Sequence, residues 1–564
     1  MDQTQILSGA RLLLAVIALN LANAVAFMDL TSVSSVSSAA AVVLNAQKTI
    51  SWASTSSLVA ACIGQCILGY LSDEFGRRRM LVVALCLFIL GSLGCGLCHW
   101  AAGAPPLYVC RAVTGAAVGS ISNLVNITQN DYLTPEKRAK YQGVQGASVG
   151  VGSLLGFLCG AAFALRDPGS LTGWPMEYFV QAGLGACVLA SICWLLPSPP
   201  ARSSTQPFGI WTIDWLGIVF GTGAVVPALI AATEGDGFGW TSRTTIALFV
   251  GSGVCTASFV ASGWWGPLEV RGVRARPIVP FRLFRNTTIS AVFLQCVLSG
   301  MAYYTFIVFM PSYLATTKGL PKMEAAAMMV PYVFTHAVWS TVSPQVMKRQ
   351  FGTDRPARAY RCMAGMGFTL WATAMLILGT LGRPASTALI VVLEVMIGLG
   401  TGSVFQNSVN TLRSQVAAAD LAVAISARNV IRYLGGAIGT AVCTAISEKV
   451  RARDLPAHLE GYADETMVGG DVRMLTPEDE ASLAHADFAG LRAGFFFGGV
   501  AVGIAAFICF FIRDVADSSD GDLTQEGLPL RSPGLSSPDS DEYDRPKPIV
   551  GWRHRFVRML LRKG

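Results

Sequence analysis

Runs of apolar residues, most of them 20 residues or longer and separated by short polar segments, make up most of the chain. A helix needs roughly 20 apolar residues to cross the ~30 Å hydrocarbon core of a bilayer, so each run is long enough to span a membrane. The pattern predicts fourteen membrane-spanning helices. Their approximate ranges are 11–38, 51–71, 79–99, 105–127, 141–165, 175–196, 211–232, 244–265, 288–315, 323–346, 359–381, 385–410, 421–446 and 488–512.

Two segments depart from this pattern. Residues 448–487 are polar, with two prolines and scattered acids, and are predicted to form the last outer loop. Residues 516–564 are predicted to be a disordered cytoplasmic tail, because residues 513–550 are rich in Ser, Pro, Gly and Asp. The tail ends in a stretch that mixes Trp, Phe and Leu with Arg, which suits either a short helix on an anionic membrane surface or a solvated basic end.

The composition excludes a soluble enzyme. Hydrophobic residues make up 52 % of the chain and charged residues 14 %, against roughly 25 % charged residues in soluble proteins. The net charge of +7 is weakly basic, and in a membrane protein such charge belongs to cytoplasmic loops, so no nucleic-acid binding is expected. Many of the 14 cysteines lie inside apolar runs and are interpreted as small hydrophobic residues. We expect no metal, cofactor or catalytic residue.

Lysine and arginine are distributed unevenly among the short loops. If the N-terminus is placed inside, the inner loops carry about three times as many Lys and Arg residues as the outer ones. Positive charge accumulates on the cytoplasmic side of membrane proteins, so this orientation is favoured. With an even number of spans, both termini are then predicted to be cytoplasmic.

The turn after the second apolar run carries the segment Gly69-Tyr-Leu-Ser-Asp73-Glu-Phe-Gly76-Arg77-Arg78. It resembles the loop signature of the major facilitator superfamily, G-x-L-x-D-x-x-G-R-R/K. The glycines permit a tight turn and close helix approach, and Asp73 can cap a helix and pair with an arginine. The resemblance implies a conformational latch, whereas the segment by itself is also compatible with an ordinary basic loop.

Two ionisable residues lie inside apolar runs, where they are costly and mark function by default. Arg111, in Leu-Tyr-Val-Cys-Arg111-Ala-Val-Thr-Gly, resembles the family's motif B arginine, which is associated with proton coupling. Asp29, in Phe-Met-Asp29-Leu-Thr, resembles an element of the drug:H+ antiporter branch with fourteen spans. We expect Asp29 and Arg111 to couple protons. The alternatives are an Arg111 that reaches the membrane surface and an Asp29 exposed at the outer mouth. Glu177 and Glu394 are candidate second protonation sites.

The fifth apolar run contains a stripe of small residues that includes Gly152, Gly156 and Gly160. Small residues let helices approach closely in a membrane, so this stripe is predicted to pack against another helix. The run also resembles the antiporter motif G-x-x-x-G-P-x-x-G-G. Phe157 replaces the proline of that motif and Ala161 replaces its last glycine, and both departures weaken the inference of antiport.

The resemblance to the fourteen-span branch covers nearly all of residues 10–515. It includes Ile213-Asp-Trp-Leu-Gly217 before the seventh run and Arg428-Asn-Val-Ile-Arg432-Tyr-Leu-Gly-Gly-Ala-Ile-Gly439 in the thirteenth. The pattern looks most like fungal multidrug or toxin efflux proteins. It implies an all-α membrane protein with a six-helix bundle in residues 1–200, two extra helices in 201–270 and a second six-helix bundle in 271–515.

In such a fold the substrate binds near the midplane between the halves. Polar and aromatic residues inside the runs are therefore candidate cavity residues, since sites for amphipathic compounds are apolar and aromatic with a few polar anchors. The candidates are Asn123, Gln145, Gln295, Tyr303, Tyr304, His336, Gln406, Asn407 and Asn410.

Together these features predict a proton-coupled secondary active transporter that exports small amphipathic organic compounds, such as a drug, toxin or secondary metabolite, by alternating access. Its expected partners are the substrate, protons and the lipid bilayer, and we expect a monomer. The plasma membrane is the expected location, with the vacuolar membrane as the alternative. Two other functions stay open: import or vacuolar transport of a nutrient such as a basic amino acid or an iron chelate, and a non-transporting receptor.

Overall fold

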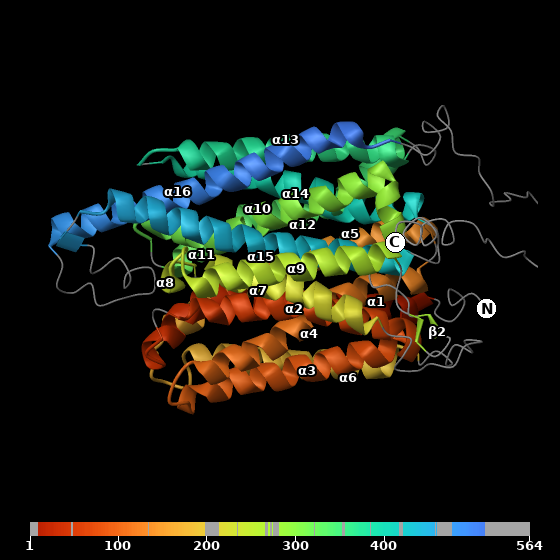
Figure 1. Cartoon of the computed structure of the whole chain (residues 1–564), viewed down its shortest axis with the longest axis horizontal. Coiled ribbons are helices and arrows are strands. Elements are labelled where there is room, and N and C mark those ends of the chain that lie inside the picture. The colour runs from red at the N-terminus through yellow and green to blue at the C-terminus, as the bar shows by residue number, and fades with distance from the viewer. Residues whose placement is uncertain are drawn as a thin grey trace, which may run out of the picture. The chain divides into compact units, whose positions relative to one another are not determined.

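The computed structural model describes residues 9–46, 49–133, 135–197, 214–233, 235–265, 269–270, 273–274, 281–320, 322–351, 356–383, 385–416, 421–456, 458–459 and 476–513. The predicted tail, residues 516–564, lies outside the described residues, and so does the side chain of Asp73. Within the described ranges the chain is almost entirely helical (Figure 1).

Fourteen long helices account for most of the described residues, and each of them overlaps one predicted apolar run. They are α1 (Gly9–Val43), α2 (Ser51–Phe75), α3 (Arg77–Leu97), α4 (Pro105–Tyr132), α5 (Pro135–Ala164), α6 (Trp174–Leu195), α7 (Trp215–Thr233), α9 (Arg243–Trp265), α10 (Thr287–Lys318), α12 (Val330–Phe351), α13 (Pro356–Thr380), α14 (Thr387–Gln415), α15 (Leu421–Asp454) and α16 (Pro477–Ile508).

Short elements connect some of these helices. They are η2 (Cys98–Trp100), α8 (Gly235–Phe238), β1 (Glu269–Val270), β2 (Val273–Arg274), η4 (Phe281–Arg285), α11 (Lys322–Ala327) and η8 (Cys509–Phe511). The strands β1 and β2 pair antiparallel, with Glu269 opposite Arg274.

Eleven of the described helices are long and apolar enough to cross a membrane. The three long helices outside this group are α4, α7 and α12. Helices α4 and α12 carry polar side chains along their length, including Arg111, Asn123 and His336. Helix α7 is apolar over Trp215–Ala228, and its sequence stays apolar to Ala232. The count of fourteen spans therefore stays a prediction for these three helices.

Many predicted helix ends differ from the structure by several residues, and two boundaries are wrong by more. The expected outer loop 448–487 is shorter, because α15 continues to Asp454 and α16 begins at Pro477. Arg451 and Arg453 in the last turn of α15 favour its extension, since positive charge stabilises a helix C-terminus. The start of α16 has a Thr476 cap, a first-turn proline and three first-turn acids.

The second wrong boundary is that of the tenth apolar run, predicted as 323–346. It forms two helices, α11 and α12, with a turn before Val330. Pro331 has no amide hydrogen to continue a helix from the preceding residues, which explains the break.

The long helices pack in two sets. In the first set α1 contacts α4, α5 and α6, while α2 and α3 pack on α4. In the second set α10 contacts α15 and α16, α13 contacts α14 and α16, and α12 packs on α14. The sets meet where α5 contacts α12 and where α2 contacts α15.

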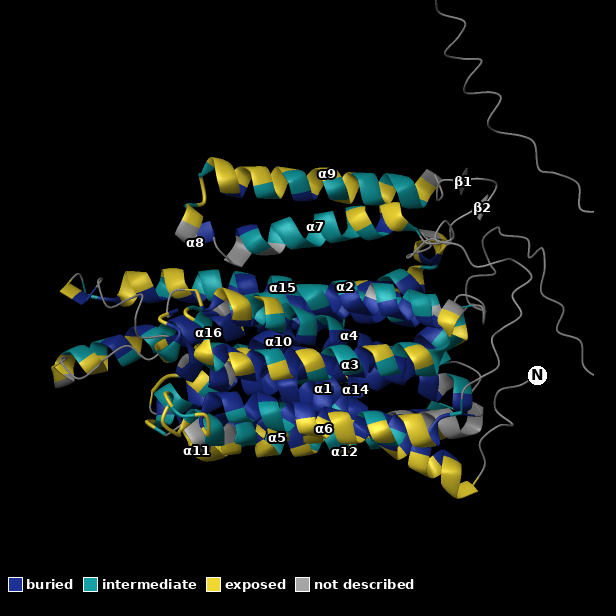
Figure 2. Ribbon diagram, turned by 90° about the horizontal axis from the view of Figure 1, so that it is seen from below, coloured by how far each residue is buried: buried dark blue, intermediate teal, exposed yellow. Residues whose placement is uncertain are grey.

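Helices α7 and α9 form a separate pair beside both sets. They pack on one another, and α7 contacts α15 and α2 (Figures 1 and 2). Large apolar side chains of α9, such as Val250, Val254 and Trp264, are exposed. In a membrane such an apolar face lies against lipid, so this pair is positioned at the periphery of the helices.

Glycines allow the closest helix contacts. The predicted stripe Gly152, Gly156 and Gly160 on α5 lies directly against the backbone of α1, so that a Cβ atom at any of the three would collide with it. Without hydrophobic drive between helices in lipid, such close backbone contact is the main source of packing energy. The stripe therefore holds α5 against the part of α1 that carries Asp29.

Candidate functional site

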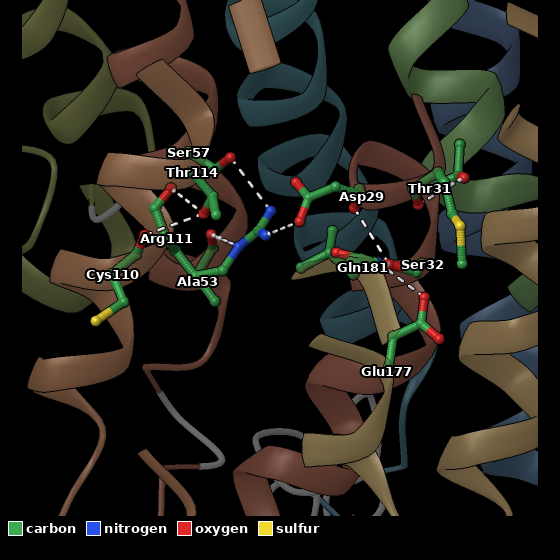
Figure 3. A network of polar contacts seen from close by, with 12 residues as sticks. Asp29, Thr31, Ser32, Ala53, Ser57, Cys110, Arg111, Thr114, Glu177 and Gln181 are labelled. Carbon is green, nitrogen blue, oxygen red and sulfur yellow. Dashed lines mark hydrogen bonds and ion pairs between the residues drawn. The ribbon is translucent and has the colours of Figure 1, made fainter. Parts of the chain in front are cut away.

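A buried ion pair joins Asp29 of α1 to Arg111 of α4 (Figure 3). The distance between Arg111 Nη1 and Asp29 Oδ1 is 2.6 Å, and both side chains are only 1 % exposed. The Nη2 atom of Arg111 also donates to Ser57 Oγ at 3.2 Å, and its Nε donates to the carbonyl oxygen of Ala53 at 3.4 Å. One guanidinium group thus connects α1, α2 and α4, and Arg111 is buried inside the protein instead of extending to its exposed surface.

The carboxylate of Asp29 is only partly satisfied. Its Oδ2 atom is buried and has no hydrogen-bond partner among the described residues. Removing one member of a buried pair costs about 3–5 kcal/mol, because the other charge is left uncompensated. The stability of this site therefore depends on the charge of Asp29.

A second buried carboxyl group lies close to this pair. Gln181 Nε2 donates to Glu177 Oε1 at 2.8 Å and to Ser32 Oγ at 2.9 Å. Ser32 lies one turn after Asp29 on α1, and its hydroxyl donates to the Asp29 carbonyl oxygen at 3.3 Å. The polar network thus runs from Arg111 through Asp29 to Glu177 (Figure 3).

The second set of helices holds a cluster of aromatic rings. The rings of Tyr303 and Phe405 lie 4.9 Å apart between centroids, and those of Tyr304 and Tyr433 lie 5.6 Å apart. We call Tyr303, Tyr304, Phe405 and Tyr433 the aromatic cluster. Its members come from α10, α14 and α15. The candidate residues Tyr303 and Tyr304 are therefore side by side with two rings that sequence reasoning did not single out.

Two arginines of α15 lie beside the aromatic cluster, and both are almost fully buried. Arg428 Nη2 donates to the Phe405 carbonyl oxygen at 2.7 Å and to Ser408 Oγ at 2.9 Å, while its Nη1 donates to Asn429 Oδ1 at 2.7 Å. Arg432 lies over two rings, 5.1 Å from the centroid of Phe405 and 5.4 Å from that of Tyr433.

The sequence offered one signal for these two arginines, because they lie four residues apart inside an apolar run. Their spacing is part of the family resemblance, which implies no role for them. Their burial shows that they belong to the interior of the protein.

Asn123 joins the two sets of helices. Its Nδ2 atom donates to Ser426 Oγ of α15 at 3.1 Å and to the Gln65 carbonyl oxygen at 3.3 Å, and its Oδ1 accepts from Asn429 Nδ2 at 3.0 Å. A second link runs from Thr341 Oγ1 of α12 to the carbonyl oxygen of Gly143 on α5, at 2.9 Å. These hydrogen bonds join the two sets of helices at their interface.

The remaining candidates lie in different environments. His336 Nδ1 is 2.8 Å from Thr401 Oγ1, and the His336 ring lies 6.0 Å from that of Phe405, so His336 borders the aromatic cluster. Gln145 and Gln406 are buried, and the side-chain oxygen of each has no partner among the described residues. Asn407 donates to Ser343 Oγ at 3.1 Å and so ties α14 to α12.

The structure places Gln295 and Asn410 away from the aromatic cluster. The Gln295 amide donates to the Ala505 carbonyl oxygen at 3.0 Å and its Oε1 accepts from Tyr360 at 3.2 Å, which places it between α10, α13 and α16. Asn410 lies near the end of α14, where its Oδ1 accepts from Arg413 Nη1 at 3.3 Å.

The turn between α2 and α3 is held by its arginines. Gly76 has a φ of 93°, a conformation that favours glycine. Arg77 Nε lies 3.0 Å from Asp131 Oδ2 of α4, its Nη1 donates to Ser72 Oγ at 2.6 Å, and Arg78 Nη2 donates to the Cys193 carbonyl oxygen at 2.5 Å. Gly69 lies against the Asn123 side chain. The sequence predicts Asp73 as an arginine partner and contains no signal for Asp131.

Two other features lie outside this site. A hollow of about 530 Å³ is bordered by Gly379, Ile446, Ala489, Arg492, Ala493, Phe496, Phe497 and Val500, and contains none of the candidate residues. In the part of the chain that the structure describes, no group of three or more His, Cys, Asp or Glu side chains is placed to hold a metal ion.

The chain was compared with known proteins by sequence and by structure. Residues 19–440 match the family model described as the Major Facilitator Superfamily. The chain is 30 % identical to Citrate exporter 1 of Yarrowia lipolytica, covering 96 % of this chain and 77 % of the relative. It is 24 % identical to the efflux pump FUS6 of Gibberella fujikuroi, covering 95 % and 94 %. A bacterial homologue of the lysosomal transporter Spinster shares its fold, with a TM-score of 0.59, 15 % identity and coverage of 89 % and 97 %.

Proposed function

The chain belongs to the major facilitator superfamily, and from that premise we propose that it exports a small organic compound in exchange for protons. Its apolar helices and its family make it a multi-pass integral membrane protein. The relatives named as an efflux pump and as a citrate exporter support export and make organic acids one class of candidate compound. We further propose a monomer in the plasma membrane with both termini in the cytoplasm.

The observation that supports proton coupling is the buried pair of Asp29 and Arg111. A proton on Asp29 removes its charge and weakens its attraction for Arg111, which still has Ser57 and the Ala53 carbonyl oxygen as partners on α2. The link between α1 and α4 then loosens while that between α2 and α4 remains. Because the two arrangements differ in their affinity for the proton, protonation biases the equilibrium between them. Glu177, a buried carboxyl group that accepts a hydrogen bond from Gln181 near this pair, is the candidate second proton site.

We propose that the two sets of helices are the halves that move. Residues 1–200 hold the first set and residues 271–515 the second, and α7 and α9 in residues 201–270 lie outside this core. Opening of the site towards the α2–α3 turn requires that the contacts of Asn123 with Ser426 and Asn429 separate. In this scheme the ion pair between Arg77 and Asp131 is the latch that holds α3 to α4.

The test uses purified protein in sealed lipid vesicles and a panel of organic compounds that includes citrate. Two fluxes are measured for each compound: exchange of labelled for unlabelled compound without a pH gradient, and net uptake driven by a pH gradient. We expect Asp29→Asn to retain exchange and to lose the acceleration by the gradient, because the alternation of the halves survives but the proton site does not. Asp167→Asn, the same change in the exposed loop between α5 and α6, is the matched control.

If Asp29→Asn keeps the wild-type response to the gradient, proton coupling at this pair is wrong. If the folded wild-type protein binds compounds but exchanges none of them, the non-transporting receptor becomes the better interpretation. Net movement only into the cytoplasmic side would favour the importer.

A further inference from the structure

The guanidinium group of Arg432 has no anionic partner. The residue is 6 % exposed, its Nε is fully buried, and its side chain makes no hydrogen bond or ion pair with any residue that the structure describes. Three other buried or half-buried arginines do have such partners, since Arg111 pairs with Asp29, Arg77 with Asp131 and Arg451 with Asp487. Arg432 therefore differs from them in its chemistry and not merely in its depth.

The surrounding helices supply no acid at this level. The sequences of α10 and α12 contain neither Asp nor Glu. The acid of α14 is Glu394, eleven residues from Phe405 and so roughly 16 Å along the helix. On α15 the next acid is Glu448, sixteen residues beyond Arg432 or roughly 24 Å. Across the interface, Asp29 is already committed to Arg111.

The positive charge is doubled by Arg428, one helical turn away on the same face of α15. Its donors are directed to a carbonyl oxygen, a hydroxyl and an amide, none of which carries a charge. Burying a guanidinium is costly unless an anion is paired with it, and the rings of Phe405 and Tyr433 offset this cost only in part. The pair of arginines is thus a strongly electropositive place in an apolar interior.

The position of Arg432 fits a transported ligand. It lies eleven residues into the 34-residue helix α15, roughly 17 Å from Leu421, and is therefore away from both helix ends. Arg428 bonds to Asn429, and Asn429 bonds to Asn123 of the other set of helices. A ligand at the arginines is therefore connected to the contacts that hold the two sets together.

We propose that Arg432, assisted by Arg428, binds a carboxylate group of the transported compound, which makes this protein a carrier of organic anions. This inference rests on the proposed export function. The planar guanidinium of Arg432 offers paired N–H donors that match the two oxygens of a carboxylate. The aromatic cluster supplies an apolar wall for the carbon skeleton. A second carboxylate gains from the charge of Arg428, so di- and tricarboxylates bind more tightly than monocarboxylates, and cations such as basic amino acids are rejected.

The experiment measures equilibrium binding rather than flux, with the full-length protein in lipid nanodiscs. The probes are citrate and succinate, with triethyl citrate as a neutral probe of the same skeleton. We expect citrate to bind and to raise the melting temperature, and triethyl citrate to bind at least tenfold more weakly. Arg432→Gln weakens citrate binding at least tenfold. Arg432→Lys keeps the charge but lacks the paired N–H donors, and it gives an intermediate affinity.

A matched control is Arg492→Gln on α16. This arginine also donates only to carbonyl oxygens and lies over a ring, but its acceptors are Gly379 and Thr380 of α13, and it borders the hollow described above instead of the aromatic cluster. It should bind citrate as the wild type does. In the absence of any probe, Arg432→Gln should melt at or above the wild-type temperature, because it removes an uncompensated charge. A merely structural role for Arg432 predicts a lower melting temperature instead.

Three results would overturn the inference: citrate binding by Arg432→Gln within twofold of wild type, equal affinity for citrate and its neutral ester, or no carboxylate binding by a wild-type protein that exchanges other compounds. The last result leaves the proposed export function intact. Conversely, Arg432-dependent citrate binding by a protein that exchanges nothing supports Arg432 as a carboxylate site and contradicts the proposed export function.

Discussion

Arg111 and Arg432 are both buried in apolar helices, and their different partners separate two tasks within one molecule. Arg111 is neutralised by a carboxylate of the protein, so its charge balance changes only when a proton arrives. Arg432 keeps its charge uncompensated by any described residue, so its balance changes when an anion arrives. In the functions proposed above, Arg111 responds to protons and Arg432 to the substrate.

The sequence placed Asp29 and Arg111 in the same functional class but did not show that they touch. They are 82 residues apart, and only the packing of α1 on α4 brings them together. Arg432 could not be recognised from sequence for a related reason. An arginine in an apolar run is informative only when its partners are known, and a missing carboxylate becomes visible only in three dimensions.

Gly152 gives a prediction at this scale. A methyl group there would collide with the backbone of α1 at Ala24, so Gly152→Ala forces α1 and α5 apart. Such overpacking costs about 1–3 kcal/mol, and the melting temperature of the purified protein should fall. Gly183→Ala on α6 is the control, because nothing lies within 4 Å of its added methyl group. That variant should melt at or slightly above the wild-type temperature, since alanine favours helix. Equal melting of the two variants would contradict the packing argument.

At the scale of helices, hydrophobic pattern predicted where each element lies but not where it ends. A helix needs about 20 apolar residues to cross a bilayer, so each spanning helix is visible in the sequence as an apolar run. Helix ends outside the hydrocarbon follow local rules instead, as at Pro331, which separates α11 from α12, and at Thr476, which caps α16. The sequence also does not predict the partner of Arg77, because Asp131 lies on α4 and no pattern in the turn between α2 and α3 indicates it.

The contact between α3 and α4 can be measured with a double-mutant cycle on Arg77→Ala and Asp131→Ala. Asp131 is 35 % exposed, so solvent screens the pair and we expect a coupling of no more than about 1 kcal/mol in unfolding free energy. Transport should respond more strongly than stability, because a latch alters the ratio of two conformations. A coupling of several kcal/mol, or transport rates unchanged in both single variants, would argue against a latch that can open.

At the scale of the whole molecule, α1–α6 and α10–α16 meet through polar contacts on α4, α5, α12 and α15. Apolar contacts also cross this interface, since Ile127 of α4 packs with Val409 and Ile425. Hydrogen bonds such as those of Asn123 are individually weak, so they can break and re-form during a transport cycle. Interfaces between parts that move resemble transient protein–protein contacts in this respect.

A crosslink between the two sets tests whether they must separate. In a variant whose other native cysteines are replaced, Asn123→Cys and Ser426→Cys are joined with a short thiol-reactive reagent. We expect exchange to stop and to return when a cleavable reagent is reduced. The control joins Thr305→Cys to the native Cys443, which lie together within the second set and should leave exchange intact. Full activity with Asn123 and Ser426 joined would mean that this contact does not open.

The unpaired charge of Arg432 also has an electrical consequence. A charge whose access alternates between the two sides of a membrane does work against the transmembrane voltage, up to about 2.3 kcal/mol per elementary charge for each 100 mV. The empty carrier is therefore drawn towards the orientation in which Arg432 faces the negative side, while a carrier neutralised by its anion is released from that pull. For an exporter that binds its compound on the negative side, the resting membrane voltage therefore favours the return of the unloaded protein to the orientation that binds the compound.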